Sequence, residues 1–205
     1  MDFWFYLSLF GFIVIILPYF LSLEHKKLEQ KYGRQKGKRI GEIYGAISGW
    51  GFFLFWFGIW ISPQNRFTIP FFQSYSIQIP ILDITINPLN LLVFIPFFSA
   101  GMWFGIKGVI KTSLKVAETH RTEKVVSTGV YSIVRHPQYL GGILAHIGFC
   151  FLLSGLYSLL ATPLVIAVVY VISWKEEQEL LREFGQEYKA YKAKVPMLIP
   201  KFTFR

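Results

Sequence analysis

Long apolar segments separated by short polar ones run along most of this chain. Five of them approach the length of a transmembrane helix, which needs about 20 mostly apolar residues: residues 3–23, 43–62, 89–110, 139–153 and 157–174. A tight turn at 154–156 joins the last two segments into a hairpin. The hairpin is extended back to residue 137, and so covers 137–174, because proline can occupy the first position of a helix. The pattern predicts an all-α integral membrane protein with about five transmembrane helices.

The tail at 175–205 has a different pattern. Apolar residues recur at helical spacing with Glu and Lys between them: Leu180, Leu181, Phe184, Tyr188 and Tyr191. This spacing predicts an amphipathic helix on the cytoplasmic surface, interrupted at Gly185 and ended by Pro196. We expect a single membrane domain over 1–205, in which 1–110 supplies three spans and 111–205 supplies the hairpin and the tail.

Charge supports the membrane assignment and orients the chain. Only 16% of the residues are charged, against about 25% in soluble domains. Of the 21 Lys and Arg residues, 20 fall on one side of a five-span arrangement, and only Arg66 lies on the other. Cytoplasmic loops carry the excess of basic residues, which predicts an outer N-terminus and a cytoplasmic C-terminus. A prokaryotic plasma membrane is expected, or the endoplasmic reticulum in a eukaryote.

Several function classes lack support in the sequence. The net charge of +9 is explained by topology and attraction to anionic lipids rather than by nucleic acid. No glycine-rich phosphate loop is present, and no His or Cys pair has metal-ligand spacing, so we expect no metal. The loop at 63–88 is interpreted as a connector, in which the alternation at 75–79 indicates a short strand or an interfacial segment.

Two polar clusters flank the hairpin and carry the candidate chemistry. Arg135, His136 and Tyr139 supply a two-pronged carboxylate clamp and further donors, although the same residue types also serve as interfacial anchors. Glu176 and Glu177 suit an amino group, or they form a solvated helix face paired with nearby cations. Leu181 lies one turn beyond Glu177, so a ligand there would touch both.

These residues resemble a known family. The run Gly-Val-Tyr-x-x-x-Arg-His-Pro-x-Tyr-x-Gly begins at Gly129, and after the hairpin Glu-Glu-x-x-Leu-x-x-x-Phe-Gly-x-x-Tyr-x-x-Tyr-x-x-x-Val-Pro-x-x-x-Pro begins at Glu176. Together they resemble the isoprenylcysteine carboxyl methyltransferase family, within a wider set of membrane methyltransferases that includes phospholipid methyltransferases. The resemblance covers about residues 120–200.

The resemblance implies a cytoplasmic S-adenosylmethionine site in the C-terminal half. It implies cofactor contacts from Glu123, Lys124, Val125, Val126, His136, Pro137, Gln138 and Tyr139, and it implies that one glutamate of the pair Glu176 and Glu177 binds the cofactor or serves catalysis. From the residues themselves we expect catalytic roles for Arg135, Glu176 and Glu177, and further cofactor contacts from Tyr131, Glu177 and Leu181. The reaction that the resemblance implies is in-line transfer of the sulfonium methyl group to a lipophilic substrate that arrives from the bilayer, a reaction that depends mainly on positioning.

This chain departs from the family pattern at two positions, and the second departure bears on which substrate it methylates. Many members have His at the position of Glu123. Carboxyl-methylating members have an Arg about one turn before the glutamate pair, where this chain has Ile172. A substrate carboxylate would therefore lack its partner, and burial of an unpaired carboxylate is costly. The acceptor stays open between a prenylcysteine-like carboxylate, a lipid amine, a thiol and another amphiphile. A sterol-reductase-like NADPH enzyme and a non-enzymatic membrane scaffold also stay open as alternatives.

Overall fold

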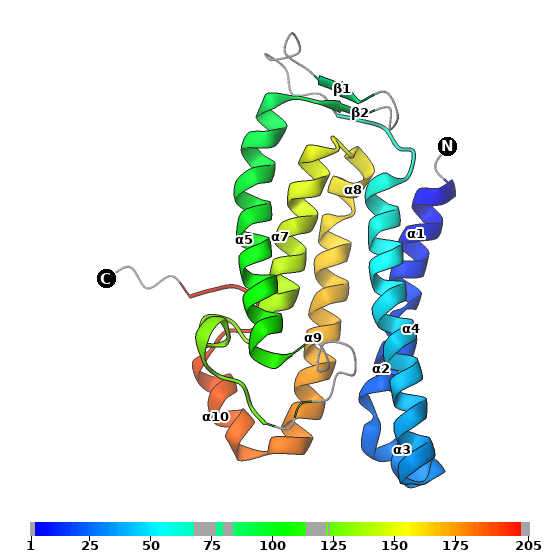
Figure 1. Ribbon diagram of the computed structural model, residues 1–205, viewed down its shortest axis with the longest axis vertical. Helices are drawn as coiled ribbons and strands as arrows, with labels where there is room; N and C mark the ends of the chain where they lie inside the picture. Colours follow the sequence, from blue (N-terminus) through cyan, green and yellow to red (C-terminus); the bar gives the residue numbers. More distant parts are fainter. Residues whose placement is uncertain (1–2, 68–76, 80–83, 114–121, 123, 202–205) are drawn as a thin grey trace.

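The computed structural model describes residues 3–67, 77–79, 84–113, 122 and 124–201. Within this part of the chain the fold is helical, apart from one small hairpin formed by β1 (Ile77–Ile79) and β2 (Ile84–Ile86), which pair antiparallel. The N-terminus and the β-hairpin lie at one end of the bundle, and α10 (Gln186–Lys194) lies at the other (Figure 1). The short strand expected within 75–79 is therefore confirmed for Ile77–Ile79.

Three helical segments are long and apolar enough to cross a membrane. The first is Phe3–Leu23, built from α1 (Phe3–Val14) and α2 (Ile16–Leu23). The break between them is at Ile15, because in a continuous helix the ring of Pro18 would clash with the carbonyl group of Val14, four residues earlier. The other two are α4 (Arg34–Ile61) and α5 (Pro88–Thr112). The protein is thus an integral membrane protein with several apolar helices.

The predicted fourth and fifth spans form a shorter hairpin. It consists of α7 (Pro137–Leu152), α8 (Leu156–Leu160) and α9 (Thr162–Phe184). At 1.5 Å per residue, the 16 residues of α7 extend about 24 Å, less than the roughly 30 Å of a bilayer core. Since α9 carries charged side chains from Lys175 onward, the predicted count of five spans is not confirmed.

Polar side chains from the segment after α4 and from α5 close the turn of this short hairpin. Nη1 of Arg66 donates to the carbonyl oxygen of Leu153 over 2.7 Å, and Nε2 of Gln64 donates to Oγ of Ser158 over 2.9 Å. Nδ2 of Asn90, on α5, donates to Oγ of Ser154 over 2.6 Å. Buried backbone carbonyl groups need such partners, so the start of the loop at 63–88 caps the turn as well as connecting two helices.

Close contact between α5 and α7 depends on glycine. A Cβ atom on Gly141 would lie 2.6 Å from the carbonyl oxygen of Gly101 and 2.8 Å from the backbone nitrogen of Gly105. Small residues allow membrane helices to approach this closely. The glycines therefore fix the position of α7, whose first turn carries the candidate site.

The end of the bundle opposite the β-hairpin contains more helix than the sequence predicted (Figure 1). The basic segment at 24–42 folds into α3 (His25–Tyr32) and the beginning of α4, which starts nine residues before the predicted span. The tail is not one amphipathic helix: α9 passes through residue 175 without a break, and α10 (Gln186–Lys194) follows Gly185. Gly185 has φ 53°, a conformation that glycine adopts without strain, so it separates two helices.

Candidate functional site

The two polar clusters predicted from the sequence lie together at the end of the bundle that carries α10. Arg135 and His136 directly precede α7, Tyr139 lies in its first turn, and Glu176 and Glu177 lie on the polar part of α9. The backbone nitrogens of Arg135 and His136 donate to the carbonyl oxygens of Pro196 and Met197 over 2.9 and 3.1 Å. The segment after α10 therefore holds the start of α7 in place.

Glu177 is the centre of a buried ion-pair cluster and is 0% exposed. Its Oε1 atom lies 2.6 Å from Nε of Arg135 and 3.3 Å from Nε2 of His136. Its Oε2 atom lies 2.7 Å from Nζ of Lys192, on α10. Nη1 of Arg135 also donates to the carbonyl oxygens of Lys192 and Val195. One carboxylate thus links α7, α9 and α10.

The same contacts shift the ionisation of the cluster. Burial alone would raise the pKa of Glu177, but His136, Arg135 and Lys192 donate hydrogen bonds to its charged form and lower the pKa to about 2. Burial opposes the charged form of His136, but Glu176 and Glu177 outweigh it and raise its pKa above the usual 6.5. Glu177 is therefore a carboxylate at neutral pH.

Glu176 has a different environment from its neighbour. Its Oε1 atom accepts a hydrogen bond from the Tyr139 hydroxyl over 2.7 Å and another from the Tyr19 hydroxyl, and its Oε2 atom lies 3.3 Å from Nδ1 of His136. The oxygens of Tyr19 and Tyr139 are 2.5 Å apart. Two phenols and one imidazole surround this carboxylate, whereas Glu177 is surrounded by cations.

A cavity of about 1030 Å³ adjoins this cluster. Of the predicted site residues, those that line it are Lys124, Val125, Val126, Tyr131, Arg135, His136, Gln138, Tyr139 and Glu176. Nε2 of Gln138 donates to the hydroxyl oxygens of Tyr131 and Thr112 over 3.2 and 3.1 Å. These contacts fix the amide at the junction of α5, α7 and the preceding segment.

The remaining predicted residues are placed differently. Glu177, Pro137 and Leu181 are not among the described residues that line the cavity, where Leu180 is found instead of Leu181. Glu177 faces the cations behind the wall, and Pro137 begins α7. Glu123 lies outside the described residues.

Two side chains of the cluster were missed by sequence reasoning. Tyr19 reaches Glu176 from the first span, 157 positions away in sequence, and Lys192 reaches Glu177 from α10. Tyr19 lies within an apolar segment where a tyrosine suits the lipid interface, so its sequence context does not indicate a site. Lys192 is one of several lysines on a short helix, and only the fold distinguishes it.

Comparison with known proteins shows which family this region resembles. Residues 91–187, just under half of the chain, match the family model described as phospholipid methyltransferase. Over these residues the chain is similar to the phospholipid methyltransferase family. Members of the family use S-adenosyl-L-methionine. No solved structure matches the chain significantly.

Three curated relatives are similar to part of the chain. The chain is 36% identical over 78 residues to methanethiol S-methyltransferase 2 of Bradyrhizobium diazoefficiens, covering 37% of this chain and 29% of the relative. It is 38% identical over 84 residues to protein-S-isoprenylcysteine O-methyltransferase of Saccharomyces cerevisiae, covering 37% and 32%. The Schizosaccharomyces pombe enzyme of the same name is 33% identical over 92 residues, covering 41% and 36%.

The extent of these matches limits what they transfer. The matched part spans about a third of the length of these relatives. By their names, one relative methylates a thiol sulfur and the other two methylate an oxygen of isoprenylcysteine. The similarity therefore concerns the part of the chain that contains the candidate site, while the acceptor must be argued from this chain's own residues.

Proposed function

We propose that this protein is a membrane methyltransferase that uses S-adenosyl-L-methionine to methylate a lipophilic acceptor. The observation that carries the proposal is the convergence of the two family motifs on one cavity that continues into the apolar part of the bundle. The catalytic and cofactor-binding roles given below are parts of this proposal.

The residues at the polar end of the cavity fit the proposed cofactor. Its amino group and ribose hydroxyls need acceptors, and Glu176 and the Gln138 amide line the cavity there; its carboxylate needs donors, and Lys124 and His136 line the same region. The volume of about 1030 Å³ is at the upper end of ordinary ligand pockets, which leaves room for a second molecule. When bound, the cofactor supplies an electrophilic methyl group on a sulfonium centre.

Glu176 and Glu177 take different roles in this proposal. Both oxygens of Glu177 already face cations, so Glu177 and Arg135 hold α7, α9 and α10 in register. Glu176 lines the cavity beside Tyr139, where it accepts a hydrogen bond from a ligand amino group or takes the proton that an acceptor amine or thiol releases.

The acceptor is expected to be a lipophilic amine or thiol rather than a carboxylate. Ile172 lines the cavity and is buried, and the family resemblance places it near the Arg of carboxyl-methylating members. An acceptor carboxylate beside Ile172 would lack the partner that this Arg supplies, and burial of an unpaired carboxylate is costly. The side chains of Trp50 and Phe53 also line the cavity and are exposed on the lipid-facing side of α4, which supports entry from the bilayer.

The experiment that tests the function is methyl transfer in lipid nanodiscs. Methyl-labelled S-adenosyl-L-methionine is supplied with dodecanethiol, dodecylamine or N-acetyl-S-farnesylcysteine. We expect label in the thiol or the amine, and at least a hundredfold less with Glu176→Gln, since general base catalysis contributes about 10²–10⁴-fold. Label only in farnesylcysteine would refute the acceptor class. No transfer to any of the three probes would refute the methyltransferase assignment.

A further inference from the structure

The cavity continues from the polar site along one face of α4. The residues of this helix that line the cavity are Glu42, Gly45, Ala46, Ser48, Gly49, Trp50, Phe52, Phe53 and Trp56, most of them at intervals of three and four. Fourteen positions separate Glu42 from Trp56, which corresponds to about 21 Å along the helix. From Gly45 to Trp56 these side chains carry no charge. We call this part of the cavity the apolar arm.

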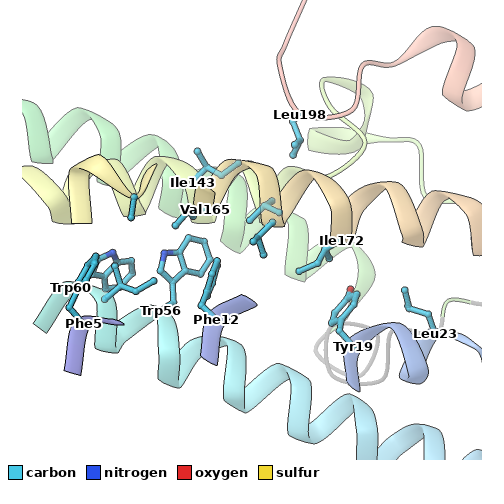
Figure 2. Close-up of a cluster of buried hydrophobic side chains, with 14 residues drawn as sticks. Phe5, Phe12, Tyr19, Leu23, Trp56, Trp60, Ile143, Val165, Ile172 and Leu198 are labelled. Atoms are coloured by element: carbon cyan, nitrogen blue, oxygen red, sulfur yellow. The ribbon is translucent and has the colours of Figure 1, made fainter. Parts of the chain in front are cut away.

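The apolar arm ends at the indole ring of Trp56. On α7 the lining reaches Gly142, where an added Cβ atom would lie 2.8 Å from Cη2 of Trp56. On α9 the lining stops at Ile172. Farther along α4, Trp60 is buried without lining the cavity. Figure 2 shows Trp56 beside Phe12 and Trp60, with Ile172 and Tyr19 nearer the polar end.

A buried histidine fixes the Trp56 ring. Nε1 of Trp56 donates to Nδ1 of His146 over 2.9 Å, and Nε1 of Trp60 donates to the same atom over 2.8 Å. Because Nδ1 accepts both bonds, Nε2 of His146 carries the proton, and it lies 3.2 Å from Oγ1 of Thr162. His146 is 0% exposed, and the proposed reaction does not use it.

We propose that the apolar arm binds the hydrocarbon tail of the methyl acceptor and that Trp56, held by His146, sets the tail length that the site accepts. The proposal rests on the proposed function. The arm is continuous with the polar cluster of Tyr139 and Glu176, so a tail lying in it would place its head group beside the candidate chemistry. Its uncharged lining selects hydrocarbon, and the rigid indole marks its far end.

The test compares Trp56→Ala with Trp60→Ala. Each substitution leaves one indole on Nδ1 of His146, so neither leaves the imidazole without a donor. Of Trp56 and Trp60, only Trp56 lines the cavity, which makes Trp60→Ala the matched control for lost packing. Trp56→Phe, which keeps most of the aromatic contact, is a second variant if Trp56→Ala does not fold.

The first readout locates the tail directly. Straight-chain thiols of increasing length, with a diazirine on the last carbon, are photolysed with the protein in nanodiscs and the labelled residues are found by mass spectrometry. In the wild type, label should concentrate near Trp56 and Gly142 and go no deeper as the chain lengthens. In Trp56→Ala it should advance past this level, and in Trp60→Ala it should not. Label confined to lipid-facing side chains would overturn the proposal.

The second readout is the rate of methyl transfer to a long thiol divided by the rate to a short thiol. This preference is measured for each variant and divided by the preference of the wild type. The greater partitioning of long thiols into the bilayer is the same for all proteins and cancels in this ratio. Burial of each further methylene is worth about fourfold in affinity, from about 0.8 kcal/mol. Room for two methylenes should raise the long-chain preference of Trp56→Ala more than tenfold. An equal rise in Trp60→Ala, or none in Trp56→Ala and Trp56→Phe, would overturn the proposal.

Cofactor titration of the same proteins distinguishes failure of the tail-binding proposal from failure of the proposed function. If S-adenosyl-L-methionine binds while no label reaches the arm, the inference about the tail is wrong and the proposed function stands. If label reaches the arm while the cofactor does not bind, the arm holds lipid in a protein of another function. That result overturns the assignment of the tail to a methyl acceptor.

Discussion

Replacement of Glu177 by glutamine should destabilise the protein far more than the same replacement at Glu176. Glu177→Gln removes the only negative charge recorded against Arg135 in the described part of the chain, where the Arg135 side chain is only 8% exposed. It also weakens the links to His136 and Lys192, so the contacts that hold α7 and α10 to α9 are lost together.

The size of the effect follows from burial. Removal of one partner from a buried ion pair costs about 3–5 kcal/mol. The value should fall near the lower limit, because Arg135 keeps hydrogen bonds to the carbonyl oxygens of Lys192 and Val195. For a chain of this size, such a loss lowers Tm by roughly 6–20 °C. Glu176→Gln should cost only about 1 kcal/mol, because an amide oxygen can still accept from Tyr139 and Tyr19.

Thermal unfolding of the detergent-solubilised proteins, followed by tryptophan fluorescence, measures both variants. Circular dichroism at low temperature confirms that each variant starts folded. Equal unfolding temperatures for wild type and Glu177→Gln would refute the structural role of this carboxylate. A larger loss for Glu176→Gln than for Glu177→Gln would show that the roles of the two glutamates are reversed.

Two further predictions concern the ionisation of His136 and the close contact between α5 and α7. Because the pKa of His136 is raised, the stability that its charged form contributes is complete below pH 6.5 and is lost as pH rises through the raised pKa. The stability that the Glu177 carboxylate contributes changes only between about pH 4.5 and 2. The Tm difference between wild type and His136→Gln should therefore shrink from pH 6 to 9, and growth of this difference would contradict the assignment. Gly141→Ala should cost about 1–3 kcal/mol by forcing α5 and α7 apart; Gly105→Ala, whose Cβ would meet nothing within 4 Å, should be tolerated, and equal unfolding temperatures would refute the close-contact argument.

Local patterns were sufficient to predict most helices. Apolar length located Phe3–Leu23, α4 and α5, and the two polar motifs identified the ends of the hairpin that face each other. The beginning of α4 was missed because Arg34 to Glu42 is polar, and a hydropathy pattern does not register a helix that continues beyond the bilayer. Gly185 was recognised as an interruption, but only its positive φ makes it the boundary between two helices.

The candidate site was predicted where it depends on sequence neighbours and missed where it depends on the fold. Arg135, His136 and Tyr139 lie within five residues, so one loop-to-helix junction brings them together. Tyr19 joins them only because α2 packs against α9. The separate environments of Glu176 and Glu177 follow from the helix rotation of about 100° between adjacent residues, which turns one side chain to the cavity and the other to the cations behind it.

Calorimetric titration of the purified protein with S-adenosyl-L-methionine and S-adenosylhomocysteine tests the central claim most directly. The account predicts micromolar binding of both compounds by wild type, with at least tenfold weaker binding by His136→Ala and Glu176→Gln proteins that remain folded. Absence of heat with a demonstrably folded wild-type protein, or equal affinities in all three proteins, would contradict the assignment of this cavity as the methyl-donor site.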